Sequence, residues 1–101
     1  MQNEELLNKV KSRLSTVIDP ETGVDVMRMK LVRDLSIDDG MKLSYVFRPS
    51  SPLCPIAIPL VLDIIHAVRE IHEIQGQRVR VEDYLQADEL NEMLRSLLGE
   101  E

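Results

Sequence analysis

The start of the chain places apolar side chains at three- and four-residue steps, which is the spacing of one helix face. These positions are Leu6, Leu7, Val10, Leu14 and Val17. Asn3 is a candidate N-cap, and Glu4 and Glu5 follow in the first turn, where the helix dipole favours anions. The pattern predicts an amphipathic helix over about 4–17, which ends at IDPETG because Pro20 disfavours helical backbone at the residue before it.

Between Val26 and Asp38 the pattern changes to alternation of apolar and polar residues, which is typical of strands. The alternation is interrupted near Val32, which predicts either a bulge or a strand that starts late. The sequence DDG at 38–40 is a hairpin turn signal, and MKLSYVF, which begins at Met41, alternates again. We therefore expect two antiparallel strands.

A second helix is predicted over about 58–74. Its main apolar stripe consists of Val61, Ile64, Ile65, Val68 and Ile71, and Leu60, Ala67 and Ile74 widen it. So wide a face predicts burial against the sheet and against something further, such as a partner subunit. Gly76 is expected to end this helix, and QRVRVE predicts a short strand with Val79 and Val81 on one face.

The last apolar stripe predicts a third helix over about 88–98, with Asp88 as N-cap and Gly99 as a left-handed residue at its end. The resulting order is helix, strand, strand, helix, strand, helix. It predicts an α+β fold, a two-layer domain with a three-stranded sheet. We expect a single domain over residues 1–101 with a core over about 4–83.

The amino-acid composition argues against several classes of function. The formal net charge is −6, with 18 acidic and 12 basic residues, and aromatic residues make up 3% of the chain. Nucleic-acid surfaces need clustered Lys and Arg and usually stacking rings, so no nucleic-acid partner is expected. The N-terminus mixes charges with apolar residues, unlike a signal peptide or membrane span, which predicts a soluble protein with no membrane partner. A single cysteine excludes an internal disulfide and fits a reducing, cytoplasmic compartment.

That cysteine, Cys54, lies in RPSSPLCPIAIP at 48–59, between the second predicted strand and the second predicted helix. Polar side chains and several prolines surround it, and prolines reduce the conformational freedom of a loop. If Pro55 is the first helical residue, Cys54 is an N-cap, where backbone amides and the helix dipole stabilise a thiolate. Alternatively, Pro59 delays the regular helix to about Ile58, and Cys54 lies in a rigid loop before it. A buried, inert thiol is the third alternative.

Three motifs in this order resemble one known family. They are IDPETGVDV at 18–26, KLVRDLSIDDG at 30–40, and SSPLCP at 50–55 followed by a long apolar helix. Together they resemble the MIP18-like family, also called the domain of unknown function 59 family, over about residues 5–83. Its members are small iron–sulfur assembly factors and include SufT-like and PaaD-like proteins. The resemblance implies a helix, strand, strand, helix, strand order and a role in the maturation of iron–sulfur proteins.

The resemblance also implies the site residues. The important cysteine falls on Cys54, the carboxylates of the Asp-Pro-Glu motif fall on Asp19 and Glu21, and the paired hydroxyl residues fall on Ser50 and Ser51. The chain departs from the family pattern in three places: Ser50 stands where Thr is usual, the tail lacks a tryptophan, and Lys30 stands where Gly is frequent. A lysine there is expected to leave less room or to place a charge near the strand. Asp19 has an alternative, structural role, because Asp-Pro turns often use Asp to cap backbone amides.

Ligand chemistry limits what the site does alone. An iron–sulfur cluster normally takes four protein ligands, mostly thiolates, and this chain offers one. A labile cluster bound at Cys54 would be shared with a second subunit or a client, or be completed by Asp19, Glu21 or a small thiol. His66 and His72 do not share a helix face, and we leave them out of the site.

Three function classes follow. The leading hypothesis is a non-enzymatic iron–sulfur assembly or carrier factor that acts through Cys54 and docks to client or assembly proteins. The second is a cysteine-dependent enzyme with Cys54 as nucleophile, which lacks an obvious histidine partner. The third is an interaction adaptor whose wide helix face builds a homodimer or a complex, with Cys54 incidental.

Overall fold

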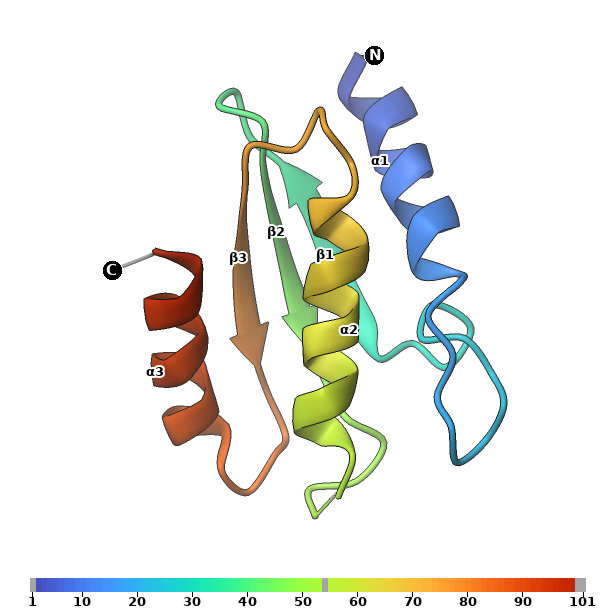
Figure 1. Cartoon of the computed structure of the whole chain (residues 1–101), viewed down its shortest axis with the longest axis vertical. Coiled ribbons are helices and arrows are strands. Elements are labelled where there is room, and N and C mark those ends of the chain that lie inside the picture. The colour runs from blue at the N-terminus through green and yellow to red at the C-terminus, as the bar shows by residue number, and fades with distance from the viewer. Residues whose placement is uncertain (1, 54, 100–101) are drawn as a thin grey trace.

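The computed structural model describes residues 2–53 and 55–99. The elements are α1 (Gln2–Leu14), β1 (Val32–Ile37), β2 (Lys42–Phe47), α2 (Ala57–Arg69), β3 (Gly76–Val81) and α3 (Ala87–Leu98). Figure 1 shows the three strands side by side with α2 in front of them, α1 to the right of β1 and α3 beside β3. The predicted α+β class and the order helix, strand, strand, helix, strand, helix are confirmed.

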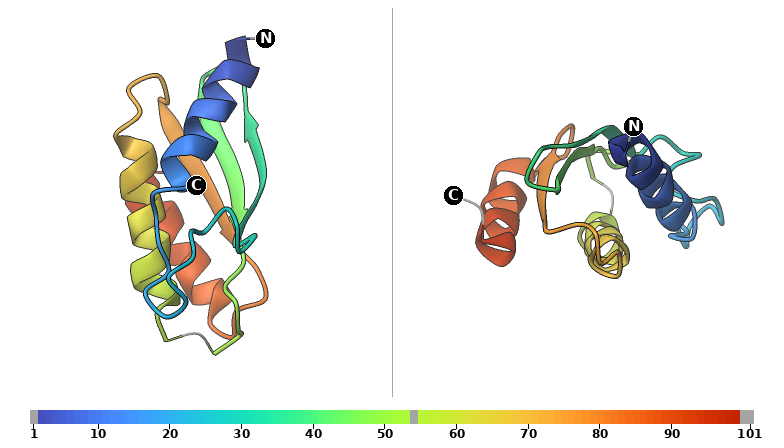
Figure 2. Two further views of the ribbon diagram at one scale, coloured as in Figure 1. Left: turned by 90° about the vertical axis from the view of Figure 1, so that its right-hand side faces the viewer. Right: turned by 90° about the horizontal axis from the view of Figure 1, so that it is seen from above.

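The sheet is mixed, in the order β1-β2-β3. The first two strands are antiparallel neighbours joined by the predicted hairpin turn, whereas β2 and β3 are parallel. Parallel neighbours need a crossover connection, and α2 is that connection. Seen from above in Figure 2, α1 and α2 cover one face of the sheet, and no described helix covers the other.

Alternation along β2 decides which face is buried. Leu43, Tyr45 and Phe47 point toward the helices and are at most 2% exposed, while the residues between them are partly exposed. The strand β3 repeats this pattern, with Val79 and Val81 buried and Arg residues outward. An antiparallel or mixed sheet with one covered face needs this alternation, because a shift by one residue would move the apolar set into solvent.

The wide apolar face of α2 is buried within the chain. Leu60 and Ala67, which widen the stripe, are only 2% and 7% exposed, because the sheet and α1 pack against α2. No described helix is long and apolar enough to cross a membrane. The width of the α2 stripe therefore does not require a partner subunit.

The predicted ends of α1 are wrong. This helix begins at Gln2, so Asn3 lies inside it and is not the N-cap. It ends at Leu14 rather than near Val17. The amides of Thr16 and Val17 bond to carbonyls only three residues back, which is the tighter turn that often follows an α-helix.

The predicted end of α2 is also wrong. The helix ends at Arg69 rather than near residue 74, and Gly76 is the first residue of β3. Ile71 follows the helix in a turn, with its amide bonded to the Val68 carbonyl, yet it is 4% exposed. The apolar periodicity continues past the helix because the residues of this turn still pack on the core.

Of the two caps predicted for α3, the N-cap is wrong and the C-terminal glycine is confirmed. The N-cap is Gln86, so the prediction of Asp88 is wrong, and Asp88 lies in the first turn. Gly99 has φ of 72° and its amide bonds to the carbonyls of the last turn, which confirms the predicted left-handed end.

The irregularity predicted near Val32 has two parts. The strand β1 starts late, at Val32, and its register with β2 shifts between Arg33 and Ser36, where Asp34 has φ of 55°.

Lys30, just before the strand, has φ of 60°. This left-handed backbone is one that glycine adopts without strain. Glycine and lysine therefore differ in backbone strain at this position.

One chain of buried hydrogen bonds joins the two layers. The Tyr45 hydroxyl donates to Gln77 Oε1 at 2.7 Å, and Gln77 Nε2 donates to the Ile65 carbonyl at 3.0 Å. Both side chains are almost fully buried, and burial raises the pKa of Tyr45 far above its usual value. The chain therefore connects β2, β3 and α2 through polar groups that have no access to water.

The substitution Tyr45→Phe tests this connection. It leaves Gln77 Oε1 unpaired in the core, and we expect a loss of about 1–3 kcal/mol in the free energy of unfolding, measured by urea denaturation. The matched control is Tyr84→Phe at a partly exposed tyrosine, where the change should be within about 0.5 kcal/mol. Equal effects of the two substitutions would contradict the role of the Tyr45 hydroxyl.

The other edge of β3 is held by a side chain of α3. Asn91 Oδ1 accepts from the Val81 amide at 2.7 Å, and Asn91 Nδ2 donates to the Val81 carbonyl at 3.0 Å. The side-chain amide thus makes both bonds that a neighbouring strand would make. Leu90 and Leu94 of the same helix are buried, so α3 packs on this edge through apolar contacts as well.

Asn91→Asp isolates the amide donor. The variant keeps the shape and the acceptor, but it places a charged oxygen against the Val81 carbonyl oxygen. We expect a loss of about 1–3 kcal/mol in the free energy of unfolding. Asn8→Asp, at an exposed position of α1, makes the same chemical change and should cost less than about 0.5 kcal/mol. If the two variants unfold alike, Asn91 does not anchor α3.

Candidate functional site

The parallel pairing of β2 and β3 brings two segments together. Parallel strands end at the same edge of the sheet, so the chain leaves β2 into residues 48–56 and leaves β3 into residues 82–86 at one place. The Glu82 amide donates to the Phe47 carbonyl at 3.0 Å, and the Leu85 amide donates to the Pro52 carbonyl at 2.9 Å. We call these two segments, 48–56 and 82–86, the rim.

Charged and apolar groups meet in the rim. Arg48 forms an ion pair with Asp83 across the two segments. Beside this pair is an open hollow of about 470 Å³, whose lining includes Ser50 and Tyr84. The hollow gives the rim a concave surface at the carboxyl edge of the sheet, which is where open α/β sheets commonly bind ligands.

Cys54 belongs to the rim by sequence but lies outside the described residues. The N-cap predicted at residue 54 is instead Ile56, and α2 begins at Ala57. Its first helical bond runs from the Leu60 amide to the Ile56 carbonyl at 2.9 Å. Pro59 fits in this first turn because an amide there would have no partner within the helix. A helix that begins near Ile58, the second alternative, is thus within one residue of the observed start.

Both predicted serines lie in the rim and are exposed. Ser50 lines the hollow. The Ser51 hydroxyl accepts from the Leu53 amide at 3.3 Å, which is a local turn contact. The two hydroxyls therefore differ: Ser51 shapes the loop, and Ser50 faces the open space next to it.

The predicted carboxylates lie together in the turn between α1 and β1. Asp19 is 1% exposed, and its Oδ1 accepts from the Glu21 amide at 2.8 Å. Its backbone amide donates to the Val24 carbonyl at 2.9 Å and its carbonyl accepts from the Gly23 amide at 2.8 Å. Glu21 is exposed. Asp19 thus caps an amide of its own turn, as the structural alternative expects, and it does so out of contact with water.

This turn and the rim lie at the same end of the molecule, as the two side-on views show (Figures 1 and 2). A backbone bond from the Arg48 amide to the Leu31 carbonyl, 2.7 Å long, ties the rim to the segment before β1. No hydrogen bond or ion pair of the described residues joins Asp19 or Glu21 to Ser50 or Ser51. The structure therefore brings the predicted residues to one end and leaves the two groups unlinked.

A complete metal site is not assembled in the described part of the chain. Among residues 2–53 and 55–99, no group of three or more His, Cys, Asp or Glu side chains is placed to hold a metal ion. His66 and His72 are exposed, and neither belongs to the rim. Any cluster at this end would take further ligands from outside the described residues.

Sequence reasoning missed the second half of the rim. Asp83 pairs with Arg48 and the Leu85 amide bonds to the Pro52 carbonyl, although both lie far along the chain, and Tyr84 lines the hollow beside them. The available signal was the helix between the second and third strands, because strand, helix, strand predicts parallel neighbours whose carboxyl ends share an edge. Apolar and polar periodicity alone does not indicate that contact.

Comparison with known proteins agrees with this fold. The family described as iron-sulfur cluster assembly protein matches residues 7–81. The Fe-S protein maturation auxiliary factor YitW of Bacillus subtilis is 28% identical over 77% of this chain and 76% of its own length. The Fe-S protein maturation auxiliary factor SufT of Staphylococcus aureus is 31% identical over 64% of this chain and 74% of its own length.

A solved structure extends the likeness to nearly the whole chain. The domain of unknown function 59 from Bacillus anthracis has a TM-score of 0.74 and 25% identity, and the match covers 96% of this chain and 97% of that one. The resemblance found in the three motifs is thereby confirmed. Because the family match also spans most of the described elements, the chain belongs to the domain of unknown function 59 family of iron–sulfur cluster assembly proteins.

Proposed function

We propose that this protein is a non-enzymatic factor that assists the maturation of iron–sulfur proteins by holding and passing on a cluster at Cys54. The observation that supports it best is that residues 48–53, which precede the only cysteine in the sequence, meet residues 82–86 at one edge of the sheet. Its relatives YitW and SufT, named as Fe-S protein maturation auxiliary factors, support the same class of function.

The chemistry is ligand exchange on a cluster that is cargo. A thiolate of Cys54 supplies one iron ligand, and the others come from a client, a second subunit, Asp19, Glu21 or a small thiol. In transfer, a client thiolate forms the new iron–sulfur bond as the bond to Cys54 breaks, and the proton released by the client thiol can return to Cys54. No change of redox state is needed. A site that supplies few ligands of its own favours release of the cluster over its retention.

Apolar side chains on the rim support docking of a protein there. Leu53 and Leu85 are 72% and 74% exposed, and the bond between the Leu85 amide and the Pro52 carbonyl keeps them on neighbouring segments. Large exposed apolar groups that gather at one place are typical of protein contacts. This observation also supports the second candidate function, an adaptor that recruits client or assembly proteins without its own cluster.

The substitution Cys54→Ser tests the carrier function. After anaerobic reconstitution with iron and sulfide, we expect visible absorbance in the native protein and at least a tenfold smaller signal in the variant, because a serine hydroxyl is a poor iron ligand at neutral pH. Size-exclusion chromatography of the same samples reports whether a second copy supplies ligands. The control is the far-UV circular dichroism of both proteins, which should agree. Equal signals, or none in the native protein, would contradict the carrier function, and absence in both would favour the adaptor.

Two substitutions at Asp19 separate its structural role from a role of its charge. Asp19→Asn keeps the acceptor for the Glu21 amide and removes the charge, whereas Asp19→Ala removes both. If the charge helps hold a cationic iron centre, Asp19→Asn should unfold like the native protein and lose reconstituted absorbance. Asp19→Ala should in addition lose about 1–2 kcal/mol in unfolding free energy. Full absorbance in Asp19→Asn would assign Asp19 to the turn alone.

A further inference from the structure

The face of the sheet that no described helix covers carries four basic side chains. Arg80 of β3 pairs with Val46 of β2, and Val46 pairs with Arg33 of β1, so one row across the sheet reads Arg33, Val46, Arg80. The next row consists of Ser36, Ser44 and Arg78. A further position on the same face, Lys42, adds a fourth cation. We call Arg33, Lys42, Arg78 and Arg80, with the residues between them in these rows, the open face.

The two rows contain no carboxylate, although the chain as a whole has a net charge of −6. Asp38 lies next to Lys42, and its Oδ1 accepts from the Lys42 amide at 2.9 Å. The strand alternation separates the charges, because QRVRV sends Gln and Val inward and both arginines outward. A chain with more acidic than basic residues therefore presents a sheet face with four cations.

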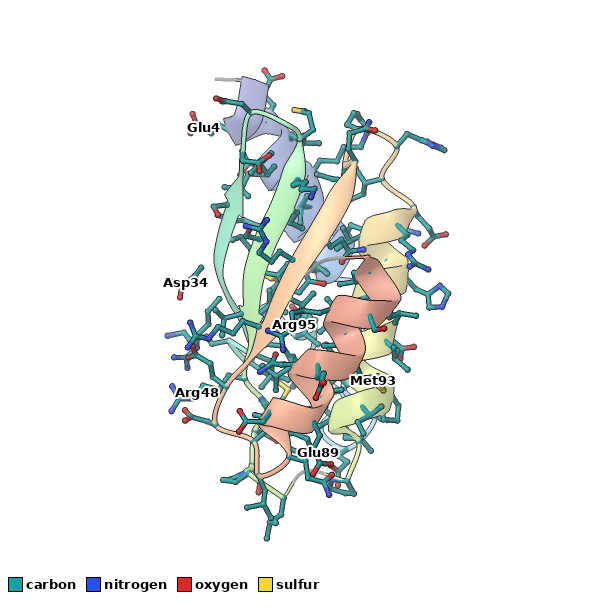
Figure 3. All side chains as sticks on the ribbon, turned by 90° about the vertical axis from the view of Figure 1, so that its left-hand side faces the viewer. Glu4, Asp34, Arg48, Glu89, Met93 and Arg95 are labelled. Atoms are coloured by element: carbon teal, nitrogen blue, oxygen red, sulfur yellow. The ribbon has the colours of Figure 1, made fainter. Side chains whose placement is uncertain are left out.

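Carboxylates lie at the margins. Glu82 pairs with Arg80 at 3.3 Å, with the Arg80 side chain 75% exposed, and Asp83 pairs with Arg48. Figure 3 shows Asp34 and Arg48 projecting on the side of the sheet away from the helices. Pairs this exposed are weak, because water and salt screen them, and they exchange readily for other partners.

The basic surface extends toward α3. An open hollow of about 570 Å³ lies between β3 and α3, and Arg78, Arg80 and Arg95 line it together with Asp88 and Glu92. In Figure 3 Arg95 lies alongside β3. The arginines outnumber the carboxylates in this hollow, so it continues the positive surface around the sheet edge.

We propose that the open face binds an acidic segment of a partner protein. Arginine offers two parallel donors that match a carboxylate, and a partner rich in Asp and Glu would meet several such groups spaced along neighbouring strands. A protein segment fits better than a nucleic acid, because the rows contain no aromatic ring on which bases could stack and the rest of the chain is acidic. Complementary charge also orients the partner during encounter.

This inference goes beyond the proposed function and needs neither Cys54 nor a cluster. The open face is on the side of the sheet, whereas the rim is at its end. A partner could therefore contact both at once, and loss of one contact would leave the other measurable.

The test is fluorescence anisotropy with a fluorescein-labelled decaglutamate peptide at low and at physiological salt. The native protein should bind the peptide, and salt should weaken the binding. Arg33→Glu/Arg80→Glu should weaken binding by about tenfold or more at low salt. The control Lys11→Glu/Arg28→Glu alters exposed cations away from the open face, lowers the net charge equally, and should change affinity less than about threefold.

Circular dichroism checks the fold of each variant, and Arg33→Ser/Arg80→Ser replaces the double Glu variant if that one fails to fold. Cys54→Ser should bind the peptide like the native protein, which separates this inference from the carrier function. Three results would overturn it: no binding by the native protein, equal losses in the face and control variants, or tighter binding of a labelled oligothymidylate than of the peptide.

Discussion

The buried chain from Tyr45 through Gln77 to the Ile65 carbonyl fixes how the two layers of this protein meet. Apolar contacts have little directional preference of their own. The bond from Gln77 Nε2 to the Ile65 carbonyl is directional and lies in a core that water does not enter, so it favours one position of α2 along the sheet, and the Tyr45 hydroxyl holds Gln77 in place for it. This constraint places the start of α2 relative to both β2 and β3.

The parallel pairing of β2 and β3 has a second effect, because it gathers the chain segments that follow both strands at one edge. The Arg48–Asp83 ion pair and the backbone bond between Leu85 and Pro52 hold them there. The turn around Asp19 follows α1 and reaches the same end from the β1 edge of the sheet. Segments that are distant in sequence thus meet beside the open hollow of about 470 Å³ at this edge.

Much of the fold could be predicted from the sequence, because one-sided burial imposes its period on each element. Leu43, Tyr45 and Phe47 predict β2 in this way. The ends of the helices were harder to predict, because buried residues outside a helix can continue its apolar stripe. Ile71 does so although it lies past the end of α2. In the hairpin, DDG located the turn, yet the left-handed residue is Met41. For the site, the order of the motifs predicts Asp19, Glu21, Ser50 and Ser51, and these assignments stay predictions. The contribution of Leu85 and the charge of the open face depend on strand pairing, which no local pattern specifies.

Asn91 has a consequence for how the protein meets other copies of itself. A small sheet has two edges whose unpaired amides and carbonyls can template a foreign strand, the first step toward fibrous aggregates. By taking both groups of Val81, Asn91 and the helix behind it close the β3 edge where that strand ends. The remaining edge, β1, is short and kinked by the register shift at Asp34, so an incoming strand would find no straight run to extend. The side-chain amide of Asn91 and the bulge in β1 therefore hinder edge-to-edge association of sheets from different copies of the protein.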